Sequence, residues 1–218
     1  MIKLFNANYR SSINHRFREK RFRFFKDLFS RIPATGTIRI LDVGGTESYW
    51  SNMDFNPGAR VHITLLNVYE DKPTQPNFSC VRGDATDLSQ FADGEFDLVH
   101  SNSVIEHLFT WEAQVKMADE VRRVGKRYYV QTPNLYFPVE PHWVLPLFQF
   151  LPFALQVWIT KKYYLVTVAE ADRDRVAVDR VREVRLLTER EMKVLFPGSQ
   201  IYREMFLGMK KSITAYRF

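Results

Sequence analysis

Short apolar segments that alternate with helical ones constrain this chain more than any other feature of its sequence. The predicted strands are IRILDV (38–43), VHITLLNV (61–68), FSCVR (78–82), FDLVHS (96–101) and GKRYYVQT (125–132). The clearest helix between them is TWEAQVKMADEVRRV (110–124), whose apolar residues share one face. Strands that are apolar at most positions and alternate with helices indicate a parallel sheet covered on both faces.

The last third of the chain has a different pattern. Thr188 and Glu191 have the spacing of a capping box and predict a helix start, and Pro197-Gly198 predicts its end. IYREMFL (201–207) and KSITAYRF (211–218) are two further strands, with Gly208-Met209-Lys210 as the expected hairpin connection. We therefore expect one α/β domain over residues 1–218, with a Rossmann-like, mostly parallel sheet, helices on both faces and a C-terminal antiparallel hairpin.

Residues 1–33 predict a basic N-terminal helix. Eight Lys or Arg residues lie between Arg10 and Arg31, against two acidic ones, in a chain whose formal net charge is +6. Such a helix could bind RNA or a membrane surface. The simpler interpretation is a solvated face beside a packed one, because an apolar stripe recurs at helical spacing: Ile13, Phe17, Phe24, Leu28 and Ile32.

The cysteine content and the chain start bear on location. The single cysteine, Cys80, cannot form an internal disulfide, which favours a reducing compartment. The start lacks the continuous apolar segment of a cleavable signal peptide, and an Arg-rich transit peptide is the minor alternative. We expect a cytoplasmic protein, with peripheral contact to a membrane left open.

An insertion separates the fifth strand from the C-terminal elements, over residues 135–187. The stretch 143–160 carries no charge for 18 residues. Pro146, Pro152 and two glutamines interrupt it, so we do not expect it to span a bilayer. Two alternatives remain: a pair of short helices, each started by its proline, or an apolar lid over an acceptor site that touches a bilayer interface.

Glycines and polar residues follow the first four predicted strands. Asp42-Val43-Gly44-Gly45-Thr46 ends the first strand, Asn67 ends the second, Gly83-Asp84-Ala85 follows the third, and Ser101-Asn102 ends the fourth, before Glu106-His107. Ligands of open α/β sheets bind beyond the carboxyl ends of the strands. Glycine lets the backbone approach a ligand closely, so the sequence predicts a binding pocket at this edge.

Three segments resemble the class I S-adenosylmethionine-dependent methyltransferases: ILDVGGTESYW, RGDATDLSQFADGEFDLVHSNSVIEHL and LLTEREMKVLFPGSQIYREMFLGMKKSITAYRF. The resemblance covers residues 38–218, least well in the insertion, and is to the branch that methylates quinones, other small molecules or lipids. It implies S-adenosylmethionine as the cofactor. It also implies that Asp42, Gly44, Gly45 and Thr46 shape the pocket for the methionine part, that Asn67 stands at the ribose, that Asp84 and Ala85 meet the adenine, and that Ser101 and Asn102 line the middle.

Two departures from the family pattern matter. The first loop has Thr46, Glu47 and Ser48 where the family usually has a further glycine, so Glu47 points either at the ligand or away from it. Asn67 stands where the family usually has an acidic residue, and an amide lacks the charge-assisted strength of a carboxylate. Either the affinity for the cofactor is weaker for this reason, or Glu70 takes the role of that carboxylate.

Methyl transfer from a sulfonium is a direct displacement that proximity and orientation can catalyse without a metal. A base is needed only if the acceptor loses a proton, and His107 is the first candidate, with His142 beside Glu140 as the second. A purely structural role for His107 is the alternative. The histidines and the cysteine show no metal-ligand spacing, so no metal is predicted.

The sequence therefore predicts a methyltransferase for a small-molecule or lipid-like acceptor. Two rivals remain. One is a non-catalytic module that binds RNA or a membrane surface. The other is a nicotinamide-dependent oxidoreductase. Such enzymes typically have G-x-G-x-x-G after the first strand, whereas this chain has only Gly44-Gly45.

Overall fold

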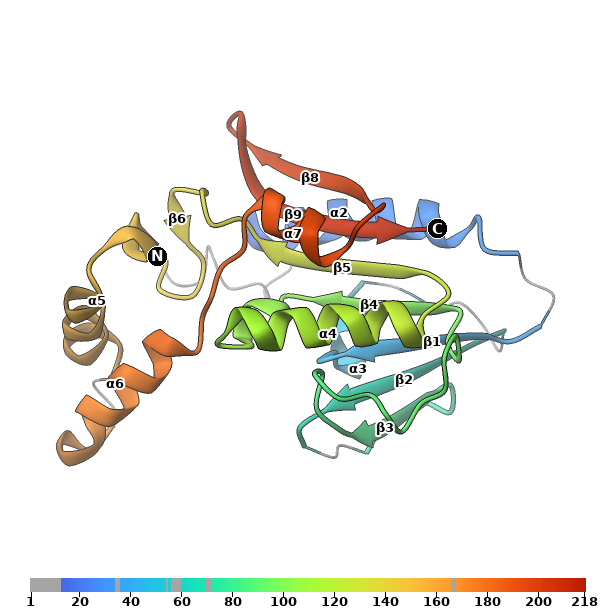
Figure 1. Ribbon diagram of the computed structural model, residues 1–218, viewed down its shortest axis with the longest axis horizontal. Coiled ribbons are helices and arrows are strands. Elements are labelled where there is room, and N and C mark those ends of the chain that lie inside the picture. The colour runs from blue at the N-terminus through green and yellow to red at the C-terminus, as the bar shows by residue number, and fades with distance from the viewer. Residues whose placement is uncertain (1–12, 34–35, 54, 56–59, 70–71, 166–167) are drawn as a thin grey trace. The chain divides into compact units, whose positions relative to one another are not determined.

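The computed structural model describes residues 13–33, 36–53, 55, 60–69, 72–165 and 168–218. Seven strands form one sheet in the order β3-β2-β1-β4-β5-β9-β8 (Figure 1). Their bounds are β1 Ile38–Val43, β2 Val61–Asn67, β3 Phe78–Arg82, β4 Leu98–Asn102, β5 Tyr128–Pro133, β8 Gln200–Phe206 and β9 Met209–Arg217. β1 pairs in parallel with β2 and with β4, and β2 pairs in parallel with β3. The predicted fold class is confirmed.

The predicted strands agree with the observed ones to within a few residues. β1 and β3 have the predicted bounds. β4 begins two residues later than predicted, because the Asp97 carboxylate accepts hydrogen bonds from the Arg39 backbone N–H (2.9 Å) and from the Lys126 ammonium (2.9 Å). Asp97 therefore belongs to a polar turn rather than to the apolar strand.

The chain divides into two compact units, which are described separately. The first unit contains residues 1–102, 120–130 and 216–218, and the second contains 103–119 and 131–215. A single functional domain over residues 1–218 stays a prediction.

The first unit packs helix α2 (Ile13–Phe29) and the short helix α3 (Glu47–Asn52) with β1 to β4. The buried stripe of α2 consists of Phe22, Phe25 and Leu28, and Phe24 is only partly buried. The predicted apolar stripe is therefore wrong at Phe24, which contacts Tyr216 instead. Phe22 and Phe25 pack against Trp50 in its place. Residues 1–12 and the Ile13 side chain lie outside the described part of the chain, as does the Asn56-Pro57-Gly58 turn.

The second unit contains the insertion and the C-terminal elements. Its helical segments are η2 (Ile105–His107), η3 (Phe148–Phe150), α5 (Phe153–Ile159), the π-helix η4 (Thr160–Tyr164), η5 (Glu170–Asp172), α6 (Arg173–Arg182) and α7 (Glu189–Leu195), together with the start of α4 (Trp111–Val124). Two short strands, β6 (Val139–Glu140) and β7 (Leu145–Pro146), pair antiparallel. α5 and α6 pack side by side (Figure 1).

The insertion differs in part from the predicted pair of helices. Pro152 does precede α5, but Pro146 lies in β7, where its missing N–H suits a two-residue edge strand better than a helix start. Among the described residues, no helix is long and apolar enough to cross a membrane.

The C-terminal elements follow local sequence rules. Thr188 accepts a hydrogen bond from the Glu191 backbone N–H, and the Glu191 side chain accepts one from the Thr188 N–H, which confirms the capping box. The hairpin turn lies at Leu207-Gly208 rather than at the predicted Gly208-Met209-Lys210. Both turn residues have positive φ (46° and 77°), as a two-residue hairpin turn of this hand requires.

Candidate functional site

The loop after β1 needs both of its glycines. Gly44 has φ 72°, a left-handed conformation that favours glycine. At Gly45, an added Cβ would lie 1.6 Å from Asp42 Oδ2, so a side chain there would displace that carboxylate. The Gly44 N–H also donates to the Leu66 carbonyl at 2.8 Å, which ties the loop to β2.

The Asp42 carboxylate is buried and bonded on both oxygens. Its Oδ1 lies 2.7 Å from His100 Nδ1, and its Oδ2 accepts a hydrogen bond from Trp50 Nε1 at 2.7 Å. The parallel ladder produces the first contact, because Asp42 of β1 lies directly beside His100 of β4. In this structure Asp42 is held by protein groups and does not cap helix α3, whose N-cap is Thr46.

His100 is surrounded by aromatic rings. Tyr129 stacks on it with centroids 5.6 Å apart, while Trp50 and Phe25 lie 4.9 and 5.3 Å away. Its Nε2 is buried and has no hydrogen-bond partner within the described residues. His100 was not among the residues predicted for the site, although a histidine within an otherwise apolar strand is a signal that the sequence contains.

The two residues after the glycines, Thr46 and Glu47, make hydrogen bonds within the protein. Thr46 accepts a hydrogen bond from the Tyr49 backbone N–H at 3.3 Å. Both Glu47 oxygens accept hydrogen bonds from Thr74, one from its N–H (2.7 Å) and one from its hydroxyl (2.6 Å). Glu47 is thus hydrogen-bonded to the segment after β2, and its carboxylate does not point at the glycine turn.

Asn67 makes a contact that the acidic residue expected from the family could not make. Its Nδ2 donates to the Gly45 carbonyl at 2.8 Å, whereas a carboxylate has no hydrogen to donate. The amide therefore holds the glycine loop and keeps its own carbonyl oxygen as an acceptor. Glu70, the suggested substitute, lies outside the described residues.

The loop after β3 is a polar turn. Asp84 is exposed, and its Oδ1 accepts hydrogen bonds from the Thr86 N–H (2.8 Å) and hydroxyl (2.9 Å), with Ala85 between them. At the end of β4, Ser101 is fully buried and Asn102 is partly exposed. All nine predicted cofactor residues thus belong to the first unit, at or beside the carboxyl ends of β1 to β4, and their roles towards a cofactor stay predictions.

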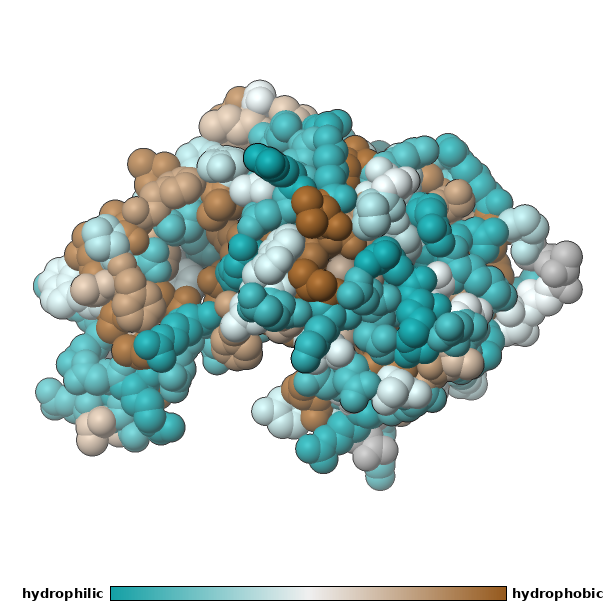
Figure 2. Space-filling view, in the orientation of Figure 1, coloured by the Kyte–Doolittle hydropathy of each residue, from teal (hydrophilic) through white to brown (hydrophobic). Residues whose placement is uncertain are grey.

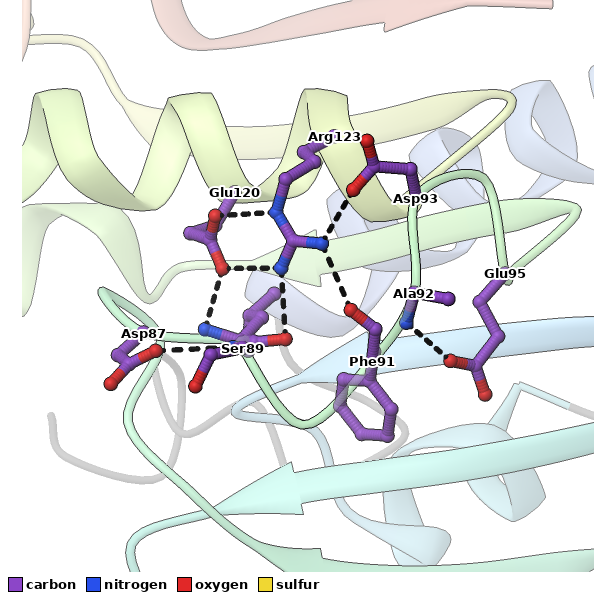
Figure 3. Close-up of polar contacts among 9 residues, drawn as sticks. Asp87, Ser89, Phe91, Ala92, Asp93, Glu95, Glu120 and Arg123 are labelled. Carbon is purple, nitrogen blue, oxygen red and sulfur yellow. Dashed lines mark hydrogen bonds and ion pairs between the residues drawn. The ribbon is translucent and has the colours of Figure 1, made fainter.

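An arginine on α4 fixes the loop that follows Asp84. Arg123 donates to Glu120, to Asp93 and to the backbone carbonyls of Leu88 and Phe91 (Figure 3). Glu120 also accepts a hydrogen bond from the Leu88 N–H at 2.7 Å. The hydrogen bonds from Arg123 lower the pKa of Glu120, so the pair stays charged and the loop has a defined path.

The second unit brings the two candidate catalytic histidines together. His142 Nδ1 lies 2.7 Å from Glu140 Oε1, and His142 Nε2 lies 3.2 Å from His107 Nε2. Glu140 Oε2 accepts hydrogen bonds from the backbone N–H groups of His142 (2.6 Å) and Trp143 (2.7 Å). The pairing of Glu140 with His142, left open by the sequence, is present, and His107 contacts His142 rather than only backbone.

Electrostatics distinguish the two histidines. Desolvation and the neighbouring His142 lower the pKa of His107 to about 4, so it is neutral at pH 7. Burial also acts to lower the pKa of His142, but the hydrogen bond and the charge of Glu140 outweigh it and raise this pKa.

Glu106 joins this group from η2. Its side chain is fully buried and accepts a hydrogen bond from the Thr132 hydroxyl at 2.9 Å. One ligand atom from each of Glu106, His107 and His142 lies within 4.8 Å of the others. The linear spacing examined in the sequence could not reveal this group, since His142 comes from a different segment, 35 residues after His107.

Comparisons with known proteins agree with this fold. Residues 50–128 match the model of a methyltransferase domain family. Two uncharacterized proteins, one from each of two strains of Mycobacterium tuberculosis, are 35% identical over 57 residues, which is 26% of this chain. That match spans only about a fifth of each relative, 20% of its length.

Solved structures resemble most of the chain in fold. A SAM-dependent methyltransferase from Archaeoglobus fulgidus has a TM-score of 0.55 at 14% identity, over 99% of both chains. One from Aquifex aeolicus has a TM-score of 0.52 at 13% identity, over 88% of this chain and 87% of its own. The CurJ carbon methyltransferase has a TM-score of 0.58 at 12% identity, over 93% of this chain and 54% of its own.

Residues 50–128 thus match a methyltransferase domain family, and the fold of the chain resembles that of solved SAM-dependent methyltransferases. The nicotinamide-dependent rival receives no support from the family match.

Proposed function

We propose that this chain transfers the methyl group of S-adenosylmethionine directly to a small-molecule or lipid-like acceptor. A lone pair of the acceptor atom forms a bond to the methyl carbon, the carbon–sulfur bond breaks, and S-adenosylhomocysteine leaves. Any proton on the acceptor atom passes to a base or to water. Proximity and alignment supply most of the rate in such a displacement.

One observation carries the choice of acceptor: α5 is apolar at six of its seven positions, yet none of its residues is buried. Figure 2 shows hydrophobic surface over α5, while α6 is mainly hydrophilic. Large apolar side chains of the insertion are exposed by 40–68%: Tyr136, Val144, Leu147, Phe150, Phe153, Leu155, Trp158 and Tyr163. An exposed patch of this kind marks a binding surface, and its apolar side chains suit an apolar acceptor.

In the first unit, the residues at the strand ends bind the cofactor. Asp42 shapes the Gly44-Gly45 turn and interacts with the cofactor ammonium through water. A direct contact is not proposed, because both of its oxygens are already bonded to His100 and Trp50. Asn67 offers its carbonyl oxygen to the ribose, and Asp84 and Ala85 meet the adenine. Thr46, Ser101 and Asn102 line the rest of the pocket.

In the second unit, His107 and His142 are the proposed catalytic residues. The Nε2 atoms of both rings face each other, and both histidines are partly exposed to solvent. An acceptor that has to lose a proton would pass it to this pair. We expect His107→Ala to lower turnover while leaving the affinity for S-adenosylhomocysteine nearly unchanged, and a loss of that affinity would make the residue structural.

The decisive experiment transfers labelled methyl from S-adenosylmethionine into a cell extract and separates lipid, small-molecule, RNA and protein fractions. Label in the lipid or small-molecule fraction is expected. Label confined to RNA or protein would contradict the acceptor class. Calorimetry with S-adenosylhomocysteine tests the cofactor separately: no heat from folded protein would refute cofactor binding, and binding without any methylated product would favour the non-catalytic module.

Peripheral membrane contact is a second proposal with its own observation. The Lys162 ammonium lies 4.9 Å from the Trp158 ring and 5.3 Å from the Tyr163 ring, an aromatic and basic combination found at bilayer interfaces. Trp158→Glu should reduce sedimentation with vesicles of anionic phospholipid. Val194→Glu, at another exposed apolar residue of the second unit, is the matched control. Equal sedimentation of both variants would refute the contact, and salt-sensitive RNA binding would favour RNA instead.

A further inference from the structure

We propose that Glu106, His107 and His142 bind one transition-metal ion of the Zn²⁺ class, in place of the metal-free site predicted from the sequence. The site itself rests on the geometry of the second unit. Only its use, described below, rests on the proposed function.

The distance between the two imidazole nitrogens fits one ion. Two nitrogens that each lie about 2.0–2.1 Å from a tetrahedral ion are separated by about 3.3 Å. The Nε2 atoms of His107 and His142 are 3.2 Å apart and face each other. An ion bound to both would lie off the line between the two nitrogens, so the rings would turn towards it while the N–N distance stays almost unchanged.

Glu140 supplies the outer contact that metal-binding histidines usually have. Its Oε1 engages His142 Nδ1 at 2.7 Å, which directs the Nε2 lone pair towards His107. The carboxylate is itself fixed by two backbone N–H groups, from His142 and Trp143, and its side chain is only 1% exposed. This arrangement sets the tautomer and the orientation of His142 before an ion arrives.

Glu106 provides the third, anionic ligand. The Thr132 hydroxyl donates a hydrogen bond to Glu106 Oε2. Carboxylates that bind metal ions are usually held by such an outer hydrogen bond. Glu106 and Glu140 are both almost fully buried, and a divalent ion bound to Glu106 would help to offset the cost of burying its charge. Two imidazoles and one carboxylate suit Zn²⁺ and its neighbours better than Mg²⁺, which prefers oxygen ligands.

Three protein ligands leave a fourth position open, as in catalytic zinc sites. If the proposed function is right, this position would take an oxygen of the acceptor, because an ion lowers the pKa of a bound hydroxyl or water. In this ion-bound form both Nε2 atoms are ligands, so the proton of the acceptor would pass to water rather than to the histidine pair. The acceptor class would then be an alcohol, phenol or carboxylic acid.

The test uses the full chain after dialysis against a chelator, without cofactor or acceptor. Calorimetry should show one Zn²⁺ bound per chain, Co²⁺ should give the visible absorption of a tetrahedral nitrogen–oxygen site, and Mg²⁺ should give no heat. His107→Asn and His142→Asn should each abolish Co²⁺ absorption, and Glu140→Gln should weaken Zn²⁺ binding by about 10–100-fold. His62→Asn is the control, because His62 contacts Ser79 in the first unit and should leave binding unchanged.

No Zn²⁺ or Co²⁺ binding by the unmodified chain would overturn the proposal, as would binding that survives both histidine substitutions. The Co²⁺ spectrum of the unmodified chain does not depend on any variant folding. The metal site and the proposed function can be refuted independently of each other. Methyl transfer by a chain that binds no Zn²⁺ would refute only the ion, and Zn²⁺ binding without any methylated product would leave only the function refuted.

Discussion

The two units each contain a carboxylate–histidine pair, and the pairs differ in what surrounds the second nitrogen. Asp42 and His100 in the first unit are joined at 2.7 Å, and both side chains are 1% exposed. Glu140 and His142 in the second unit are joined at the same distance, but His142 is 25% exposed. His100 Nε2 ends among aromatic rings, whereas His142 Nε2 meets another histidine.

This difference shows how one chemical pair can serve two purposes. In the enclosed pair both side chains are buried and Asp42 lies against Gly45, so its contribution is to hold the Gly44-Gly45 turn. An accessible pair can exchange a proton, bind an ion or touch an acceptor. Identical contact distances therefore do not imply identical roles, and exposure of the outer nitrogen decides between them.

The largest expected effect is on the enclosed pair. Asp42→Ala should reduce the free energy of unfolding by about 3–5 kcal/mol, since it leaves His100 and Trp50 buried without their acceptor. Chemical denaturation without ligand measures it. Asp42→Asn, which keeps one acceptor oxygen, should cost less.

Asp27→Ala is the matched control for that change, because Asp27 pairs with Arg31 at the surface, where both side chains are more than half exposed. A surface pair of this kind contributes about 0–1 kcal/mol. If Asp42→Ala cost no more than Asp27→Ala, the enclosed pair would not be the structural element described above.

The accessible pair should respond in the opposite way. His142→Asn should slow methyl transfer by about 100-fold, which is about 2.7 kcal/mol in the barrier. It should change the free energy of unfolding by less than about 1 kcal/mol, since the ring is partly exposed. Initial rates at saturating cofactor, together with denaturation of the same preparation, measure both quantities. A variant that lost stability but kept its rate would reverse the assignment of the two pairs.

The smallest expected effect concerns Asn67. Asn67→Asp replaces the amide donor to the Gly45 carbonyl with an oxygen that repels it. We expect the affinity for S-adenosylhomocysteine to fall about 3–10-fold, which is about 1 kcal/mol. Calorimetry decides the sign: tighter binding would show that a carboxylate at the ribose outweighs the contact that holds the loop.

The sequence predicted most of the fold because its signals are local. Alternating apolar segments defined β1 to β3 closely, and the Thr188–Glu191 spacing defined the start of α7. It placed the hairpin turn one residue too late and assigned Pro146 to a helix start. Both errors have the same cause: a glycine or a proline suits several local conformations, and pairing with the neighbouring strand selects one.

The sequence by itself determined the order of strands and helices, the glycine turn and the set of polar residues at the strand ends, since each depends on residues close together in the chain. Tertiary structure alone decided which of those polar groups were enclosed. Parallel pairing of β1 with β4 put His100 beside Asp42, and the β6–β7 turn brought His142 to His107 across 35 residues. Hydrogen bonding and burial act between neighbours in space, and for these residues the neighbours are distant in sequence.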